Sequence, residues 1–137
     1  MTAKKWNPTC ELTADGNSRT PAEVVEWAEA FVSLARARLG EGPVIGSLWA
    51  YRNGGEYICA DFRNAATGAY FDMTILVDGN PERRFHPDEP SVPDAAEALH
   101  RIGLVAAALN ASIWSVGAGK RGMELNRSVA DSPCFRV

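Results

Sequence analysis

Three runs of β-forming residues follow one another in the middle of the chain, and they constrain its fold more than any other feature. They span Val44–Tyr51, Glu56–Arg63 and Tyr70–Val77, and their apolar side chains recur with period two. Asn53-Gly54 separates the first two runs, and this dipeptide favours a tight two-residue turn. The pattern predicts a three-stranded antiparallel meander.

The turn decides which side chains share a face of the sheet, because successive residues of a strand point to opposite sides. A two-residue turn places three cross-strand pairs on one apolar side: Ile45 with Phe62, Ser47 with Ala60, and Trp49 with Ile58. The third run adds apolar residues with the same period, namely Phe71, Met73, Ile75 and Val77. We expect this side to be the core and to be covered by a helix.

A helix is predicted before the meander. Thr20 is a suitable cap, Pro21 suits the first helical position, and Glu23 completes a capping box. An apolar stripe follows with helical spacing: Val24, Ala28, Phe31, Ala35 and Leu39. Gly40 marks the end of this helix.

A second helix is predicted after Ser91, with Pro93 and Asp94 in its first turn and its end near Asn110. The remaining elements are a strand, a glycine-rich turn and a last strand: Ser112–Val116, Gly117–Gly122 and Met123–Val129. The fold class is therefore α+β, with the order α-β-β-β-α-β-β and a largely antiparallel sheet that packs its helices on one face.

Composition agrees with a single layered domain over residues 1–137. With 46% hydrophobic residues the chain has enough apolar material for a core without a stabilising metal or disulfide. Residues 1–19 are interpreted as an N-terminal extension and residues 78–91 as a long loop rich in proline and charge.

The cysteines Cys10, Cys59 and Cys134 have neither the number nor the spacing of a disulfide framework or a CxxC-type zinc site. We expect reduced thiols, although Cys10 and Cys134 would meet if the chain ends are close. Cys59 is interpreted as a small buried residue. Since the sequence contains no apolar run of secretory or membrane-spanning length, we predict a cytoplasmic protein without a cofactor.

Two acids face each other on the side of the meander opposite the core. If Phe62 and Phe71 are paired on the core side, Asp61 opposes Asp72 on the other. Two opposed carboxylates repel, so the pair indicates a bound cation, a shared proton, or exposure to solvent with Arg63 as the counter-charge. Carboxylate oxygens suit Mg²⁺ or Mn²⁺, which makes this pair a candidate catalytic or metal site.

The order αβββαβ looks like the core of restriction-endonuclease-type nucleases. In that family an acid on the second strand and an acid-x-lysine motif on the third hold the metal, and the resemblance would assign these roles to Asp61 and Asp72. The sequence departs from the pattern at Thr74, where the family has lysine. The net charge of −3 also argues against binding to a phosphate backbone. A metal-dependent enzyme is therefore the second hypothesis.

Other motifs have simpler interpretations. Gly117–Gly122 includes Lys120 and Arg121 but lacks the spacing of a phosphate-binding loop. It is interpreted as a hairpin tip whose basic side chains contact an acidic partner. His86 is placed in a proline-rich loop and His100 on a helix surface, and neither has a serine or cysteine nucleophile beside it in the sequence.

The tyrosines of the meander favour an interface. Tyr57 and Tyr70, together with Val44, Leu48 and Ala50, give the face opposite the core a mixed apolar and acidic character. Such a face is covered by the second helix, by the C-terminal tail or by a partner. The loop from Pro81 to Pro90 provides a second contact surface.

We therefore predict a non-enzymatic protein-binding module, such as a small acidic inhibitor, an immunity protein or a chaperone-like adaptor of bacterial or phage origin. Its partner is another protein, with a homodimer as one form of this. Acidic side chains prevail from residue 21 to residue 100 and basic ones after it, which favours association with a basic protein. The predicted contact residues are Tyr57, Tyr70, Asp61, Asp72, Arg84, Phe85, Lys120 and Arg121.

Overall fold

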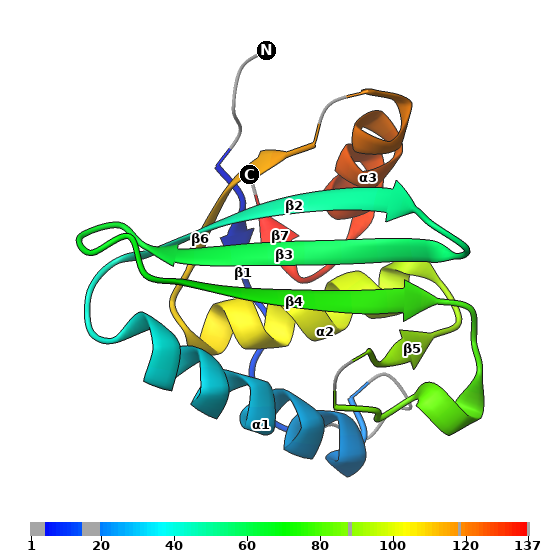
Figure 1. The fold of residues 1–137 in the computed structure, drawn as a ribbon, viewed down its shortest axis with the longest axis horizontal. Helices are drawn as coiled ribbons and strands as arrows, with labels where there is room; N and C mark the ends of the chain where they lie inside the picture. Colours follow the sequence, from blue (N-terminus) through cyan, green and yellow to red (C-terminus); the bar gives the residue numbers. More distant parts are fainter. Residues whose placement is uncertain (1–4, 15–19, 88, 118, 137) are drawn as a thin grey trace.

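The computed structural model describes residues 5–14, 20–87, 89–117 and 119–136 (Figure 1). The helices are α1 (Ala22–Leu39), the short 3-10 helix η1 (Pro81–Arg83), α2 (Ala95–Ala108) and α3 (Gly119–Asp131). The strands are β1 (Asn7–Pro8), β2 (Val44–Arg52), β3 (Glu56–Asn64), β4 (Tyr70–Val77), β5 (Ser91–Val92), β6 (Ser112–Val116) and β7 (Phe135–Arg136). The predicted α+β class and the order α-β-β-β-α-β-β are confirmed, with α3 inserted between the last two strands.

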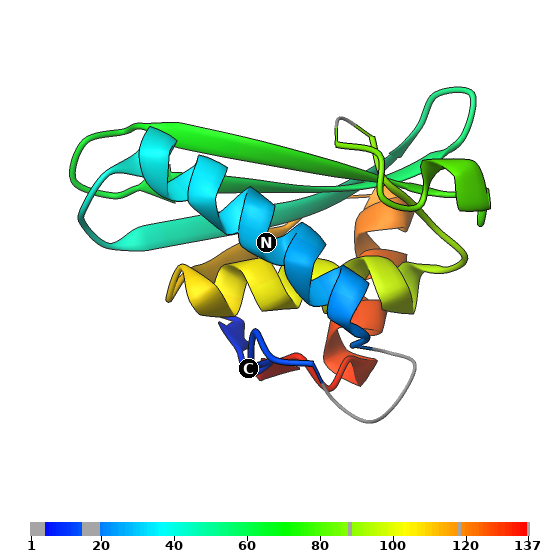
Figure 2. The same cartoon turned by 90° about the horizontal axis from the view of Figure 1, so that it is seen from below.

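The main sheet has the strand order β5-β4-β3-β2-β6. The central strands β2, β3 and β4 form the predicted antiparallel meander, whereas β6 joins β2 and β5 joins β4 in parallel. Figure 2 shows α1, α2 and α3 on one side of this sheet, with the small sheet of β1 and β7 on the far side of α2. The molecule is therefore layered as sheet, helices and terminal ribbon.

The hairpin between β2 and β3 has a longer turn than predicted. Arg52 pairs with Glu56, so three residues form the loop, and the middle one, Gly54, has a φ of 72°. A three-residue loop with glycine in the left-handed region is a common hairpin type. The predicted two-residue turn is wrong, and the register of β2 is shifted by one residue.

This shift moves every side chain of β2 to the opposite face. The predicted core residues Ile45, Ser47 and Trp49 point away from the helices, and Val44, Leu48 and Ala50, predicted for the other face, point toward them. Gly46 also lies on the helix side, where an added Cβ would be 2.6 Å from Ile113 Cδ1. A larger residue here would force the end of the Ile113 side chain to move, so the close packing of β6 against β2 favours glycine at this position.

The segment predicted as a last strand, Met123–Val129, is part of α3. Leu125 and Val129 are buried and Met123 is 68% exposed. Buried residues four apart lie on one face of a helix, whereas alternate residues are buried in a half-covered strand. Lys120 accordingly lies in the first turn of α3 and not at a hairpin tip.

The predicted capping box at the start of α1 does not form. Pro21 occupies the cap position without a side-chain hydrogen bond to the helix. Thr20 is buried instead, with its Oγ1 2.7 Å from His100 Nε2. Its hydroxyl therefore contacts α2 and does not cap α1. The C-terminus agrees with the prediction, because Gly40 caps α1 with a φ of 69°.

Helix α2 is buried on nearly all sides, because the sheet, α1 and the terminal ribbon surround it (Figure 2). Asp94 precedes the helix as its cap, and its side chain accepts a hydrogen bond from the backbone N–H of Glu97 at 2.8 Å. His100, predicted to lie on the helix surface, is only 6% exposed, and Arg101 is completely buried. An apolar stripe predicts one covered face, but here the remaining face is covered too.

The two ends of the chain lie together beneath α2. Cys10 and Cys134 form a disulfide, so the expectation of reduced thiols is wrong for this pair, while Cys59 is free and buried. Trp6 is buried and bridges β6, where its backbone exchanges hydrogen bonds with Ile113. None of the helices in the described part of the chain combines the length and the apolar character needed to cross a membrane.

Candidate functional site

Among the described residues, no helix covers the second face of β2, β3 and β4 (Figure 2). We call this surface the open face. Its side chains alternate with the core residues of the three strands: Ile45, Ser47, Trp49, Tyr51, Tyr57, Cys59, Asp61, Arg63, Tyr70, Asp72, Thr74 and Leu76.

Aromatic side chains form one part of the open face. Tyr51 and Tyr57 are directly opposed on β2 and β3, and their rings stack with centroids 5.0 Å apart. Trp49, opposite Cys59, is half-buried, and Trp114 is 49% exposed on the edge strand β6. Tyr70, which is 54% exposed, lies further along the face, opposite Arg63 and next to the acidic pair. Tyrosine and tryptophan are enriched in protein interfaces because they bury a large area and keep a polar group. The sequence had pointed only to the tyrosines of β3 and β4, because the wrong register assigned Trp49 to the core.

The acidic pair lies in the second part of the open face. Asp61 and Asp72 are directly opposite on β3 and β4, as predicted. Arg63 donates from Nε to Asp61 Oδ2 at 3.1 Å, whereas Asp61 Oδ1 is buried and has no hydrogen-bond partner within the described ranges. An unsatisfied buried carboxylate oxygen is costly, so this position favours an additional proton or cation.

The electrostatics of Asp72 agree with this geometry. Burial raises the pKa of the Asp72 carboxyl, and its interaction with the opposed Asp61 carboxylate raises it further. Within the described residues, no third histidine, cysteine, aspartate or glutamate completes a metal-binding group with this pair. The pair therefore provides two carboxylates that share a proton or face a single positive charge.

Replacing Asp72 by asparagine should stabilise the protein at neutral pH by up to about 1 kcal/mol, because the repulsion across the strands is removed. The folded state binds a proton at Asp72 more readily than the unfolded state does. The penalty of the wild-type pair is therefore present above the raised pKa and disappears as the pH falls through it. Urea unfolding at several pH values should show the difference between variant and wild type shrinking as the pH falls through the raised pKa of Asp72 and vanishing at lower pH. The control is Glu29→Gln, which removes an exposed carboxylate from α1. A stability gain that is the same at every pH would contradict the shared-proton pair.

Cys59 lies between these two parts but is not poised as a nucleophile. Its thiol is buried and 3.4 Å from Thr74 Oγ1. Burial raises the pKa of Cys59 above its ordinary value, so the reactive thiolate is disfavoured. The interpretation of Cys59 as a small buried residue agrees with this environment.

One end of the open face is bordered by the loop after η1. The nearby Glu89 carboxylate is the main cause of the raised pKa of Tyr57. Arg83 Nη2 in turn donates to Glu89 Oε2 at 2.9 Å. This ion pair holds the loop against the end of the aromatic cluster.

Two predicted contact residues of this loop lie away from the open face. Phe85 is 42% exposed and lines a cleft of about 390 Å³ with Trp27 and Leu34 of α1. The Arg84 side chain stacks beside Phe85, with Cζ 5.5 Å from the ring centroid. These residues form a separate surface next to α1.

The two predicted basic residues of α3 also lie elsewhere. Arg121 Nη1 donates to Glu56 Oε1 at 2.6 Å, and Arg52 Nη2 donates to the same oxygen at 2.8 Å. These two hydrogen bonds lower the pKa of Glu56. Arg121 thus ties α3 to the β2–β3 hairpin, whereas Lys120 is exposed. The structure places Tyr57, Tyr70, Asp61 and Asp72 on the open face, with Tyr70 next to the acidic pair and Tyr57 towards the other end of the strands, and it places the other four predicted residues elsewhere.

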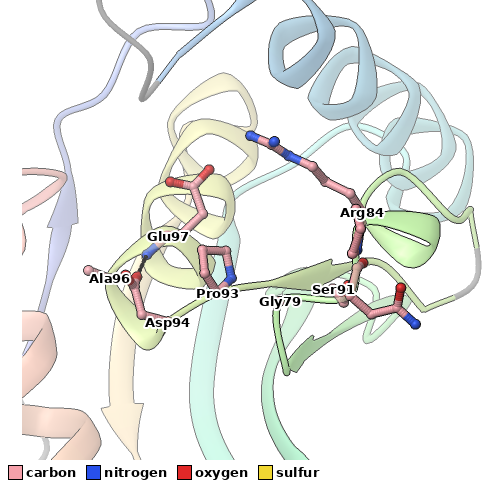
Figure 3. A pocket seen from close by; sticks show the side chains of 9 residues that line it. Gly79, Arg84, Ser91, Pro93, Asp94, Ala96 and Glu97 are labelled. Atoms are coloured by element: carbon pink, nitrogen blue, oxygen red, sulfur yellow. Dashed lines mark hydrogen bonds between the residues drawn. The ribbon is translucent and has the colours of Figure 1, made fainter.

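A cleft of about 450 Å³ lies between η1, β5 and the start of α2 (Figure 3). Its polar groups already have partners within the chain. Ser91 Oγ donates to the carbonyl of Asn80 at 2.7 Å, and Asp94 caps α2. Arg84 and Glu97 point toward each other in Figure 3, so positive and negative groups are mixed. This cleft is explained by the local turn structure.

Sequence reasoning missed a polar group of residues around α2. His100 contacts Thr20 and the disulfide cysteines, and Arg101 lies 5.0 Å from the Trp27 ring centroid. One signal was present, since the α2 sequence is apolar on almost every side and such helices are buried all round.

Comparison of the chain with known protein families, with curated proteins and with solved structures shows no significant similarity in any of the three.

Proposed function

We propose that this protein is a protein-binding module and that the open face is its contact surface. The observation that carries the proposal is the one-sided packing of the sheet. Helices α1, α2 and α3 lie on one face, and the other face presents stacked aromatic rings and, further along the same strands, an acidic pair. Aromatic residues at the centre of an interface supply most of its binding energy. A small acidic inhibitor, an immunity protein or a chaperone-like adaptor would act by binding another protein through such a surface.

The chemistry of the open face favours a partner with an arginine or lysine surrounded by apolar groups. A cation of the partner next to the exposed Asp72 carboxylate would balance the charge of the acidic pair. The excess of acidic residues between positions 21 and 100 supports the same preference, because complementary charge accelerates association. We place this interaction in the cytoplasm.

The experiment is site-specific photo-crosslinking in native cell extract. A photoreactive residue at Tyr70, on the open face, is compared with one at Met123, which is 68% exposed on α3. We expect a partner that crosslinks only through position 70. The purified partner should bind Tyr70→Ala, and the double variant Asp61→Asn/Asp72→Asn, at least about tenfold more weakly. Leu34→Ala on α1 should bind like the wild type.

Other results would contradict the proposal or assign the open face to a different binding partner. Equal crosslinking from both positions, or unchanged affinity of the open-face variants, would exclude this surface. Crosslinks to the same chain, with a dimer mass that Tyr70→Ala reduces to a monomer, would make a second copy the partner. A rise in melting temperature with millimolar Mn²⁺ or Mg²⁺ that the Asp61→Asn/Asp72→Asn variant lacks would favour the metal-dependent enzyme.

A further inference from the structure

The two chain ends and α2 bring a histidine and two cysteines together away from the open face. His100 Nδ1 lies 3.0 Å from Cys134 Sγ and 3.8 Å from Cys10 Sγ. The three possible ligand atoms all lie within 4.8 Å of one another. His100 is 6% and Cys134 1% exposed, whereas Cys10 is only partly buried, so the group is shielded from solvent except on the side of Cys10.

Two neighbouring residues shape this group. Thr20 Oγ1 lies 2.7 Å from His100 Nε2 and is itself buried. When Nε2 donates its proton to Thr20, Nδ1 presents its lone pair toward the sulfurs, as in metal-binding histidines oriented by a second hydrogen bond. Gly103 lies one turn further along α2, where an added Cβ would be 2.7 Å from Cys134 Cβ. The helix surface therefore has room for the cysteines only because residue 103 lacks a side chain.

We propose that reduction of the Cys10–Cys134 disulfide converts this group into a zinc site with Cys10 Sγ, Cys134 Sγ and His100 Nδ1 as ligands. A dithiol reductant breaks the S–S bond by thiol–disulfide exchange: it supplies two electrons and two protons, leaves two cysteine thiols, and is itself oxidised to a disulfide. Zn²⁺ then binds as the two thiol protons are released to solvent. The fourth coordination position is left to water.

The geometry and the ligand types suit zinc. Bond lengths of about 2.3 Å to sulfur and 2.0–2.1 Å to nitrogen in a tetrahedron place nitrogen and sulfur roughly 3.6 Å apart. The two His100 distances, 3.0 and 3.8 Å, lie on either side of this value. The sulfurs must separate to roughly 3.8 Å, which the reduced cysteines are free to do. Thiolate and imidazole ligands select zinc over magnesium or calcium.

The proposed zinc site would link the two ends of the chain to α2. Cys10 follows β1, Cys134 precedes β7, and His100 belongs to the central helix. The disulfide joins the chain ends under oxidising conditions, and zinc would join the same two ends, and α2 as well, under reducing conditions. The terminal ribbon is thus held in both states.

The test uses Co²⁺ as a spectroscopic substitute for zinc. Reduced wild-type protein, freed of reductant without oxygen, should bind one Co²⁺ per chain with tetrahedral d–d bands and thiolate-to-cobalt charge transfer, and Zn²⁺ should displace it. The oxidised protein should show neither band. His100→Ala should weaken binding at least about tenfold, and Thr20→Val about 10- to 100-fold. Cys59→Ala is the matched control and should bind like the wild type.

Each result decides the proposal. Octahedral bands, or binding no tighter than that of the Cys10→Ser/Cys134→Ser variant, would overturn it, as would wild-type affinity in His100→Ala. If the reduced protein loses its folded circular dichroism spectrum, recovery on adding Zn²⁺ supports the site and failure to recover contradicts it.

Discussion

Replacing Phe62 by alanine should lower the free energy of unfolding by about 3–5 kcal/mol. Phe62 is fully buried on β3, the central strand of the main sheet, and pairs with Phe71 on β4. Its other neighbour is Gly46, where an added Cβ would be 3.3 Å from Phe62 Cδ1. A glycine cannot fill the volume that the ring leaves, so the cavity between sheet and helices persists.

Urea unfolding followed by circular dichroism measures this loss. The matched control is Tyr70→Ala, which truncates an aromatic residue of the same sheet that is 54% exposed. The control should stay within about 0.5 kcal/mol of the wild type, as surface substitutions do. Equal costs for the two variants would show that the assignment of core face and open face is incorrect.

Replacing Arg101 by alanine should destabilise the protein by about 3 kcal/mol, because it leaves a cavity beside the Trp27 and Phe85 rings and removes the donor to the Arg84 carbonyl. The guanidinium is completely buried on α2 and donates to the Arg84 carbonyl at 3.2 Å and to Glu97 Oε1 at 3.4 Å. Its Cζ lies 5.0 and 5.3 Å from the ring centroids of Trp27 and Phe85. Burial is the main cause of the lowered pKa of Arg101, and it also makes this interaction strong.

Arg101→Met separates packing from charge. Methionine keeps most of the side-chain volume, and Glu97, whose side chain is 16% exposed, can turn to solvent. We expect Arg101→Met to cost about 1 kcal/mol, because an apolar residue of similar volume often replaces a buried ion at little cost. Hydrogen exchange should show faster opening of the Arg84–Phe85 segment in the alanine variant. A methionine variant as unstable as the alanine variant would assign the stabilisation to the charge alone.

Much of the fold followed from local pattern. The meander, α1 with its Gly40 end, and the β3–β4 register were predicted, because they depend on short-range periodicity and on one pair of buried phenylalanines. The turn between β2 and β3 was mispredicted by one residue, since Asn53-Gly54-Gly55 supports both a two-residue and a three-residue loop. That shift of one residue changed which alternate side chains of β2 point toward the helices.

The candidate site also combines features that the sequence predicted with features that only the structure revealed. The opposition of Asp61 and Asp72 was predicted because both lie next to the paired phenylalanines, and the structure places them there. Trp49 and Tyr51 joined the open face only once the register of β2 was known. Arg121 was predicted as a partner contact, but it is engaged by Glu56 from a hairpin distant in sequence.

By itself the sequence determined the class of fold, the three central strands and the acidic pair, because periodicity and neighbouring residues define them. The tertiary structure alone decided the β2 register, the helical state of residues 123–129, the burial of His100 and Arg101, and the meeting of Cys10 with Cys134 across a separation of 124 residues. The physical reason is that these features depend on how whole layers stack. Side chains on one helix or strand cannot specify what covers their other side.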